Sequence, residues 1–146
     1  MKVHAWKTDT YNRSGLIANL RMNGLHAVVH PEALGETDGY MPLKNLGANS
    51  RVAQNGQRQV RMKRLDAYNV LEVHLVKVDT EGFEFPILRE ATETLKKHCP
   101  KIFLELHRPI TPDSKEKCME LPKTLGYDKF TFVDERGSPS QHIFCS

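Results

Sequence analysis

The hydrophobic and polar positions along the chain alternate between two kinds of apolar segment. Short apolar runs are typical of strands, whereas apolar residues that recur every three or four positions are typical of helices. The short runs predict four main strands, at Val3–Trp6, Leu25–His30, Leu71–Val78 and Lys101–Leu106. The helical period predicts helices at Tyr11–Asn23, Pro86–His98 and Ser114–Leu125. Strands that alternate with helices favour an α/β fold with a parallel sheet.

The remaining apolar segments depart from this alternation. Tyr40–Leu43 and Gln59–Leu65 are predicted strands on either side of a polar segment, Asn45–Gln57, which we interpret as a surface loop. Phe130–Val133 and His142–Cys145 are predicted to pair as an antiparallel hairpin. The third main strand is almost continuously apolar and the fourth nearly so. We therefore expect the third to be covered on both faces and the fourth to be buried.

Composition and charge are those of one ordinary globular domain over residues 1–146. The net charge of +3 is mild, and the basic run at residues 58–64 alternates with apolar residues as a half-exposed strand does, so nucleic-acid binding is not expected. No run could span a membrane, and the first residues lack the apolar run of a signal peptide. Three cysteines without a C-x-x-C pair favour a reducing compartment, so a cytoplasmic location is expected.

The most distinctive segment joins a predicted strand to a predicted helix. The apolar run ending at Val78 leads into Asp79, Glu81 and Glu84, and a helix begins near Pro86. Open α/β sheets bind ligands at the carboxyl ends of their strands, and negative charge is favoured at a helix N-terminus. The segment therefore predicts a functional site together with the fold class.

This segment, read from Val76 to Glu84, resembles the K-x-D-x-E-G-x-E signature of the FkbM-type methyltransferases, which use S-adenosylmethionine. Further segments resemble other motifs of the family and occur in the family's order along nearly the whole chain. They are residues 19–23, 33–35, 65–66, 87–91, 100–102 and 104–107. The resemblance implies a class I methyltransferase fold, which is a Rossmann-like sheet, mostly parallel, with an antiparallel C-terminal hairpin.

Two departures from the family pattern concern the cofactor. The family's first strand and its glycine-rich loop would precede Val3 and are lacking here, so we expect the chain to be an N-terminally truncated form of a longer domain. The family usually has an acidic residue at the end of the next strand, where this chain has Lys7, and Asp9 replaces it only if the turn shifts. Both departures are expected to weaken binding of the cofactor.

The resemblance assigns roles to nine residues. Those implied in catalysis are Asp79, Glu81 and His107. Those implied in binding S-adenosylmethionine are Asp9, Asn19, Ala33, Leu34 and Asp79. Those implied on the acceptor side are Glu84 and Glu105.

Each role has a structural alternative. The three carboxylates that follow Val78 could complement a helix dipole, Asn19 could cap a helix end, and plain packing explains Ala33 and Leu34 equally well. Glu105 and His107 lie on one face of a strand, where His107 could act as a general base near neutral pH or simply form a strand-end pair with Glu105. No histidine has the spacing of a metal motif such as H-E-x-x-H, so no metal site is predicted, although Glu81 and Glu84 are carboxylates of the kind that magnesium and calcium bind.

Three functions remain open at this point. The first is transfer of a methyl group from S-adenosylmethionine to a hydroxyl of a sugar or small metabolite, with a small molecule or glycan as acceptor and no nucleic-acid or membrane partner. The second is a degenerate, non-catalytic methyltransferase-like domain that binds a partner, which Lys7 and the missing loop would favour. The third, another nucleotide-dependent Rossmann-like enzyme, lacks support because no G-x-G-x-x-G motif is present.

Overall fold

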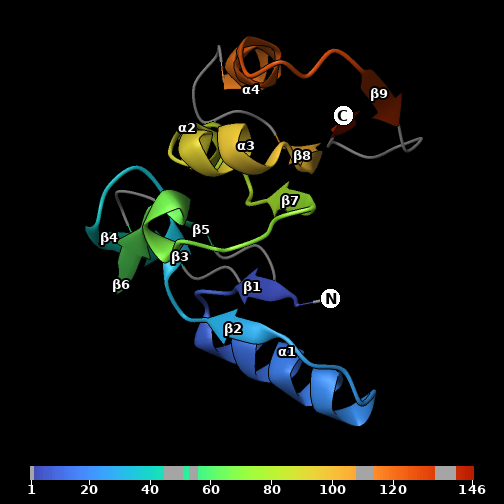
Figure 1. The fold of residues 1–146 in the computed structure, drawn as a ribbon. Helices are drawn as coiled ribbons and strands as arrows, with labels where there is room; N and C mark the ends of the chain where they lie inside the picture. The colour runs from blue at the N-terminus through green and yellow to red at the C-terminus, as the bar shows by residue number, and fades with distance from the viewer. Residues whose placement is uncertain (1, 45–50, 53–55, 108–113, 134–140) are drawn as a thin grey trace. The chain divides into compact units, whose positions relative to one another are not determined.

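The computed structural model describes residues 2–44, 51–52, 56–107, 114–133 and 141–146, and the chain divides into two compact units, Met1–Lys63 and Arg64–Ser146 (Figure 1). The first unit contains β1 (His4–Trp6), α1 (Thr10–Met22), β2 (Val28–His30), β3 (Ala33–Leu34), β4 (Gly39–Lys44), β5 (Arg51–Val52) and β6 (Arg58–Lys63). The second contains a 3₁₀ turn (Leu65–Tyr68), β7 (Leu75–Asp79), α2 (Glu84–Arg89), α3 (Thr92–His98), β8 (Lys101–Leu106), α4 (Ser114–Thr124), β9 (Phe130–Val133) and β10 (Gln141–Cys145). The predicted mixture of helices and strands is confirmed.

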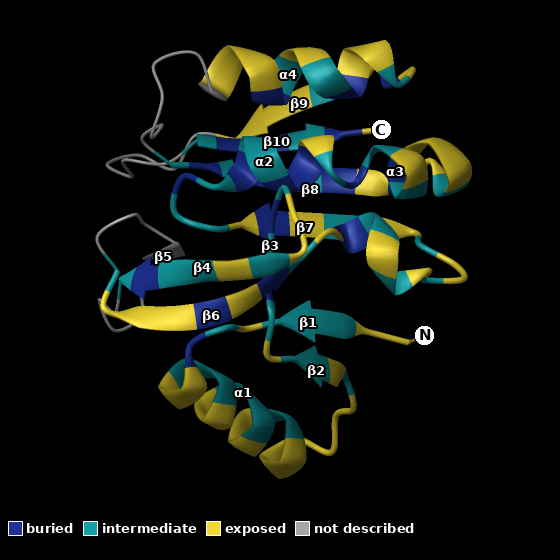
Figure 2. Ribbon diagram, turned by 90° about the vertical axis from the view of Figure 1, so that its left-hand side faces the viewer, coloured by how far each residue is buried: buried dark blue, intermediate teal, exposed yellow. Residues whose placement is uncertain are grey.

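The first unit begins with a strand–helix–strand unit. β1 and β2 are parallel, with Trp6 paired to His30, and α1 connects them. The Asp9 carboxylate caps α1 by accepting a hydrogen bond from the Asn12 N–H (2.9 Å). α1 contains no buried residue, and Figure 2 shows its exposed outer face in yellow. Leu16, Ile17 and Leu20 are half-buried, so one face of this amphipathic helix is partly covered.

A second sheet in the first unit has the strand order β3-β6-β4-β5. β3 and β6 are parallel, while β4 is antiparallel to both β6 and β5. The prediction of a loop throughout Asn45–Gln57 is wrong at Arg51 and Val52, which form β5 by pairing with Lys44 and Leu43. Backbone pairing needs no apolar side chain, so the polar composition of the segment did not reveal this strand. Residues 45–50 and 53–55 lie outside the described part.

The second unit is built on one sheet with the strand order β7-β8-β10-β9. β7 and β8 are parallel, and β10 is antiparallel to both β8 and β9. The predicted antiparallel pairing of β9 with β10 is confirmed, and β10 lies inside the sheet while β9 forms its edge. The turn expected at residues 137–139 lies outside the described residues. α2 packs against α4 and against β7 and β8.

The core of the second unit is formed by apolar residues from its strands and helices. β8 buries alternate residues, so the expected continuous burial of this strand is wrong at Phe103, which is half-buried. β7 is also less covered than expected, because Leu75 is 60% exposed and only Val78 is buried. β7 is an edge strand of its sheet, with β8 as its neighbour. The side chains at the core are Leu65, Val78, Ile87, Leu88, Ala91, Leu95, Ile102, Leu104, Leu106, Cys118, Tyr127, Ile143 and Cys145.

The helix predicted over Pro86–His98 is two helices, α2 and α3, separated at Glu90 and Ala91. The first turn of α3 is capped from outside the helix by Asp66, whose carboxylate accepts hydrogen bonds from the Glu93 N–H (3.1 Å) and the Thr94 N–H (2.9 Å). This capping favours a new helix start. Because the cap comes from a residue far away in the sequence, the helical period of the segment did not predict the break.

Two further observations concern the cysteines and the apolar character of the helices. All three cysteines are free, and burial raises the pKa of the Cys118 and Cys145 thiols to about 12 and about 11, with Glu84 contributing at Cys118. These two thiols are therefore unreactive at neutral pH. Among the described helices, none has the length and apolar character needed to cross a membrane.

Candidate functional site

The candidate site lies at the carboxyl ends of two parallel strands in the second unit. Asp79 is the last residue of β7, and the strand register pairs it with Glu105 near the end of β8. Parallel strands end at the same edge of a sheet, so two carboxylates that are 26 positions apart become neighbours. This is the edge at which α/β folds place their ligands.

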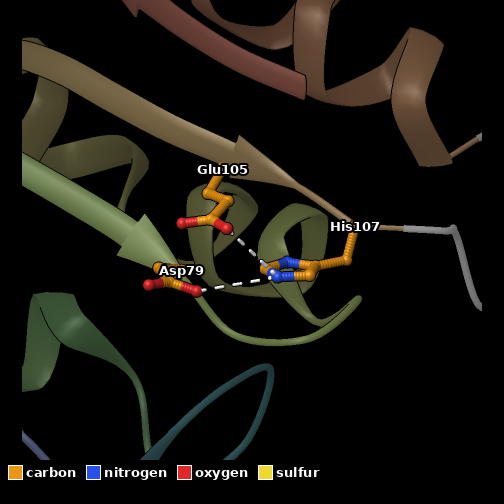
Figure 3. A group of neighbouring side chains, drawn as sticks. All are labelled: Asp79, Glu105 and His107. Atoms are coloured by element: carbon orange, nitrogen blue, oxygen red, sulfur yellow. Dashed lines mark ion pairs between the residues drawn. The ribbon is translucent and has the colours of Figure 1, made fainter. Parts of the chain in front are cut away.

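His107 follows β8 and projects toward these two carboxylates (Figure 3). Its Nε2 lies 3.5 Å from Glu105 Oε1, 3.8 Å from Asp79 Oδ1 and 3.7 Å from Glu81 Oε1. These separations exceed a hydrogen bond of good geometry. One imidazole nitrogen therefore faces three carboxylate oxygens without being hydrogen-bonded to them.

The other ring nitrogen of His107 is held by Glu84. Glu84 is 4% exposed, and its Oε1 accepts hydrogen bonds from the Gly82 N–H (2.9 Å) and the Thr80 N–H (3.2 Å). The same oxygen lies 3.1 Å from His107 Nδ1. An oxygen that already accepts from two amides is an acceptor toward the imidazole as well, so Nδ1 carries the proton in this contact. Glu84 thereby fixes both the turn after β7 and the orientation of His107.

The turn between β7 and α2 has two residues with positive φ, Glu81 at 57° and Gly82 at 99°. Glycine adopts this region without a steric penalty, so Gly82 suits this tight turn. Glu81 has a Cβ, so its left-handed conformation costs about 1–2 kcal/mol. This conformation places the Glu81 carboxylate beside His107.

Lys77 forms an ion pair with Asp79. Its Nζ lies 2.9 Å from Asp79 Oδ2 and 4.0 Å from Glu105 Oε2. Burial alone would raise the pKa of Asp79, but the hydrogen bond and charge of Lys77, together with the charge of His107, outweigh it and leave that pKa below its ordinary value. Asp79 is therefore an anion at neutral pH, and its Oδ1 faces His107.

The carboxylates around His107 also change its protonation. Burial alone would lower the pKa of His107, but the hydrogen bond to Glu84 and the charges of Glu81, Glu84 and Glu105 outweigh it and raise the pKa above 6.5. A raised pKa in the folded state means that protonation of His107 stabilises the fold. That stabilisation is fully present below pH 6.5 and is lost as the pH rises through the raised value.

We therefore expect the free energy of unfolding of the metal-free chain to fall as the pH rises above 6.5, and to fall less steeply in His107→Gln. Urea denaturation in the presence of a chelator at a series of pH values measures both slopes. His74→Gln is the matched control, because the His74 side chain is 75% exposed and should leave the wild-type slope unchanged. Equal slopes in the wild type and His107→Gln would show that the protonation of His107 is not coupled to folding.

The structure thus brings together five of the residues singled out from the sequence. These are Asp79, Glu81, Glu84, Glu105 and His107. Glu105 and His107 share one side of the strand end, as their alternation predicted. The cluster can accept a proton, hold a cation or bind a hydroxyl group, because it combines carboxylates with an imidazole.

The other four residues belong to the first unit and occupy different places in it. Asp9 is 6% exposed and caps α1. Asn19 lies in the last turns of the same helix, beside a shallow surface groove, and its carbonyl accepts from the Asn23 N–H (3.2 Å). Ala33 and Leu34 form β3, where Ala33 is 5% exposed. Their assignment to the cofactor stays a prediction.

Two members of the cluster were given no role in it from the sequence. Lys77, the lysine of the signature segment, lies two positions before Asp79 on the same face of β7, and this spacing could have indicated their contact. His142 Nε2 lies 3.5 Å from Glu105 Oε2 because β10 pairs with β8 and aligns His142 with Glu105. That register joins residues 37 positions apart, and nothing local in the sequence indicates it.

Comparison with known proteins identifies a family. The model of the methyltransferase FkbM domain matches residues 18–134. A solved structure, methyltransferase FkbM from Methylobacillus flagellatus KT, is similar with a TM-score of 0.73 at 16% identity. The similarity covers 99% of this chain and 36% of that one, so this chain spans about a third of the length of its structural neighbour. No curated protein matches the chain.

Proposed function

The chain belongs to the FkbM methyltransferase family, and from that premise we propose that it uses S-adenosylmethionine to methylate a hydroxyl oxygen of a sugar or another small metabolite. The observation that carries the proposal is the cluster at the ends of β7 and β8, where Asp79, Glu105 and His107 converge from the family's signature segments. A small molecule or a glycan is the proposed acceptor.

We propose a class I, Rossmann-like arrangement for the domain. The first support is the parallel pair β1 and β2, joined by α1. The second is the parallel pair β7 and β8, joined by α2 and α3. Two strand–helix–strand units with parallel strands are what such a sheet is built from.

The residues of the cluster suit the charged part of the proposed cofactor. S-adenosylmethionine supplies a methyl group on a positively charged sulfur, together with an ammonium group. Asp79 is anionic and its side chain is 37% exposed, so it can pair with the ammonium group or orient the acceptor hydroxyl. In the first unit, Ala33 and Leu34 are the proposed contacts for the adenine, and Asp9 and Asn19 for the remaining polar groups.

The residues also suit removal of a proton from an acceptor hydroxyl. His107 Nε2 faces the carboxylates, while Glu84 fixes the ring through Nδ1, so a neutral His107 can accept a proton at Nε2. The neighbouring Glu81, Asp79 and Glu105 stabilise the imidazolium that forms. Glu84 Oε1 is already engaged by the Gly82 N–H and by His107 Nδ1, so we propose that Glu84 positions His107 rather than contacting the acceptor. Glu105 is the residue that we propose on the acceptor side.

Direct methyl transfer depends strongly on alignment of the two reacting groups. A cluster on the rigid ends of two strands, with its histidine fixed by a buried carboxylate, is a suitable support for that alignment. The rival proposal, a non-catalytic binding domain, has one observation in its favour. The Asp9 carboxylate, the acidic group that follows Lys7, is buried and used as a helix cap.

Titration calorimetry with S-adenosylmethionine tests the proposal. We expect saturable binding in the micromolar range, unchanged in Asp128→Ala, because Asp128 is an exposed carboxylate outside the cluster. Weaker binding in Asp79→Ala would assign Asp79 to the cofactor, and unchanged binding would assign it to the acceptor side. A folded wild-type chain that does not bind S-adenosylmethionine would overturn the claim that this chain is itself the enzyme.

A further inference from the structure

We propose that Asp79, Glu105 and His107 bind a divalent transition-metal ion at the ends of β7 and β8 (Figure 3). The ligands would be Asp79 Oδ1, Glu105 Oε1 and His107 Nε2. One ligand atom from each of the three residues lies within 4.8 Å of the others. Imidazole and carboxylate together are a ligand set that suits ions such as Mn²⁺ and Zn²⁺.

The separations already approach those around a bound ion. Ligand atoms bound tetrahedrally to zinc at about 2.0–2.2 Å lie about 3.4 Å from one another. His107 Nε2 lies 3.5 Å from Glu105 Oε1 and 3.8 Å from Asp79 Oδ1. Small side-chain rotations would therefore bring the three atoms to ligand distance without moving either strand.

The tautomer of His107 is the one that a metal ligand needs. Because Nδ1 donates to Glu84, the lone pair of neutral His107 is on Nε2 and faces the carboxylates. A neutral lone pair directed at carboxylate oxygens is unfavourable unless a proton or a metal ion lies between them. A carboxylate that holds the far nitrogen of a histidine is also the usual support for a metal-binding imidazole.

The outer oxygens of the two carboxylates are engaged by other groups. Lys77 Nζ contacts Asp79 Oδ2 and approaches Glu105 Oε2, and His142 Nε2 also faces Glu105 Oε2. The inner oxygens, Oδ1 and Oε1, are the ones that face His107. Each carboxylate is thus oriented to offer one oxygen to an ion.

His142 borders the cluster from β10. It is 8% exposed, its Nδ1 has no hydrogen-bond partner among the described residues, and its Nε2 points at Glu105 from 3.5 Å. The nitrogen that lacks a partner, Nδ1, is not the one that faces the cluster, so His142 bears on the site through the contact of its Nε2 with Glu105 Oε2.

The charge balance also favours a cation. The carboxylates of Asp79, Glu81, Glu84 and Glu105 bring four negative charges, and Lys77 brings one positive charge. Among the described residues, carboxylates therefore outnumber the lysine beside them, which favours a bound cation.

The role of the ion in methyl transfer rests on the proposed function. A six-coordinate ion such as Mn²⁺, held by three protein ligands, would keep open positions at which two neighbouring oxygens of an acceptor could bind. Coordination lowers the pKa of a bound hydroxyl, so Glu81 rather than His107 would then take its proton. The acceptor class would be a compound with adjacent oxygens, such as a vicinal diol of a sugar.

Metal binding is tested on the chelator-treated chain alone, without S-adenosylmethionine or acceptor, so its failure is separate from a failure of the proposed function. We expect one equivalent of Mn²⁺ to bind, seen as loss of the free-ion electron paramagnetic resonance signal. The wild-type chain with bound Mn²⁺ should show electron spin echo modulation from a directly bound imidazole nitrogen. This measurement does not depend on the folding of any variant. Zn²⁺ should displace the Mn²⁺.

The variants locate the site. His107→Gln and Glu105→Gln should each weaken Mn²⁺ binding by about 100-fold or more, with the nitrogen modulation lost in the first. Asp128 is an exposed carboxylate in the same unit, so Asp128→Asn is the control and should bind Mn²⁺ as tightly as the wild type does. Absence of binding by both Mn²⁺ and Zn²⁺, or bound Mn²⁺ without nitrogen modulation, would overturn the proposal.

Discussion

Replacement of Glu84 by alanine is expected to destabilise the fold by about 2–4 kcal/mol. The carboxylate is 4% exposed and accepts from the Gly82 and Thr80 amides and from His107. Alanine would leave these donors without their acceptor, and a buried donor left unpaired costs about 1–3 kcal/mol. Glu84→Gln keeps one acceptor oxygen and should lose less stability than Glu84→Ala.

Urea denaturation of the variants measures this effect. Glu93→Ala is the matched control, because the Glu93 side chain is 78% exposed on a helix of the same unit and should change stability by no more than about 0.5 kcal/mol. If Glu84→Ala were as stable as Glu93→Ala, then Glu84 would not hold the turn, and the orientation of His107 would need another cause.

The second large effect is expected in the rate of methyl transfer by His107→Gln. Loss of a proton-accepting group lowers turnover by about 10²–10⁴-fold. Loss of a metal ligand at the same position would also lower turnover. Turnover should therefore fall whether His107 accepts the proton or binds the metal ion. Because the proposed role of His107 is toward the acceptor hydroxyl, affinity for S-adenosylmethionine should change little while kcat falls.

This prediction is measured with methyl-labelled S-adenosylmethionine and an acceptor found by screening sugars and polyols. His74→Gln, at an exposed histidine just before β7, should retain the wild-type rate. The dependence of kcat on pH separates the catalytic role from a structural one, since a structural role would lower kcat equally at every pH. Full activity in a folded His107→Gln chain would remove His107 from the reaction.

The part of the site that was predictable from the sequence is the part encoded locally. Asp79, Glu81 and Gly82 follow one another at the end of β7, and Glu105 and His107 alternate at the end of β8. A strand pattern followed by carboxylates and a helix start gave their positions. Their convergence followed from the general rule that parallel strands end at one edge.

The parts that were not predictable depend on contacts between distant segments. Asp66 caps α3 and so divides a segment whose period is that of one helix. The pairing of β10 with β8 brings His142 to Glu105, and an edge position leaves much of β7 exposed although its sequence is almost continuously apolar. Register and edge position are set by the whole sheet, so no local pattern contains them.

The central claim is that S-adenosylmethionine binds beside the cluster at the ends of β7 and β8. Nuclear magnetic resonance of the isotope-labelled chain, titrated with S-adenosylmethionine, tests it most directly. We predict that the shift changes of the second unit concentrate at the amides of Thr80, Glu81 and Gly82 and at the His107 ring, because these groups surround the cluster. If binding saturates and the signals of these groups do not shift, the cofactor binds elsewhere and the account is contradicted.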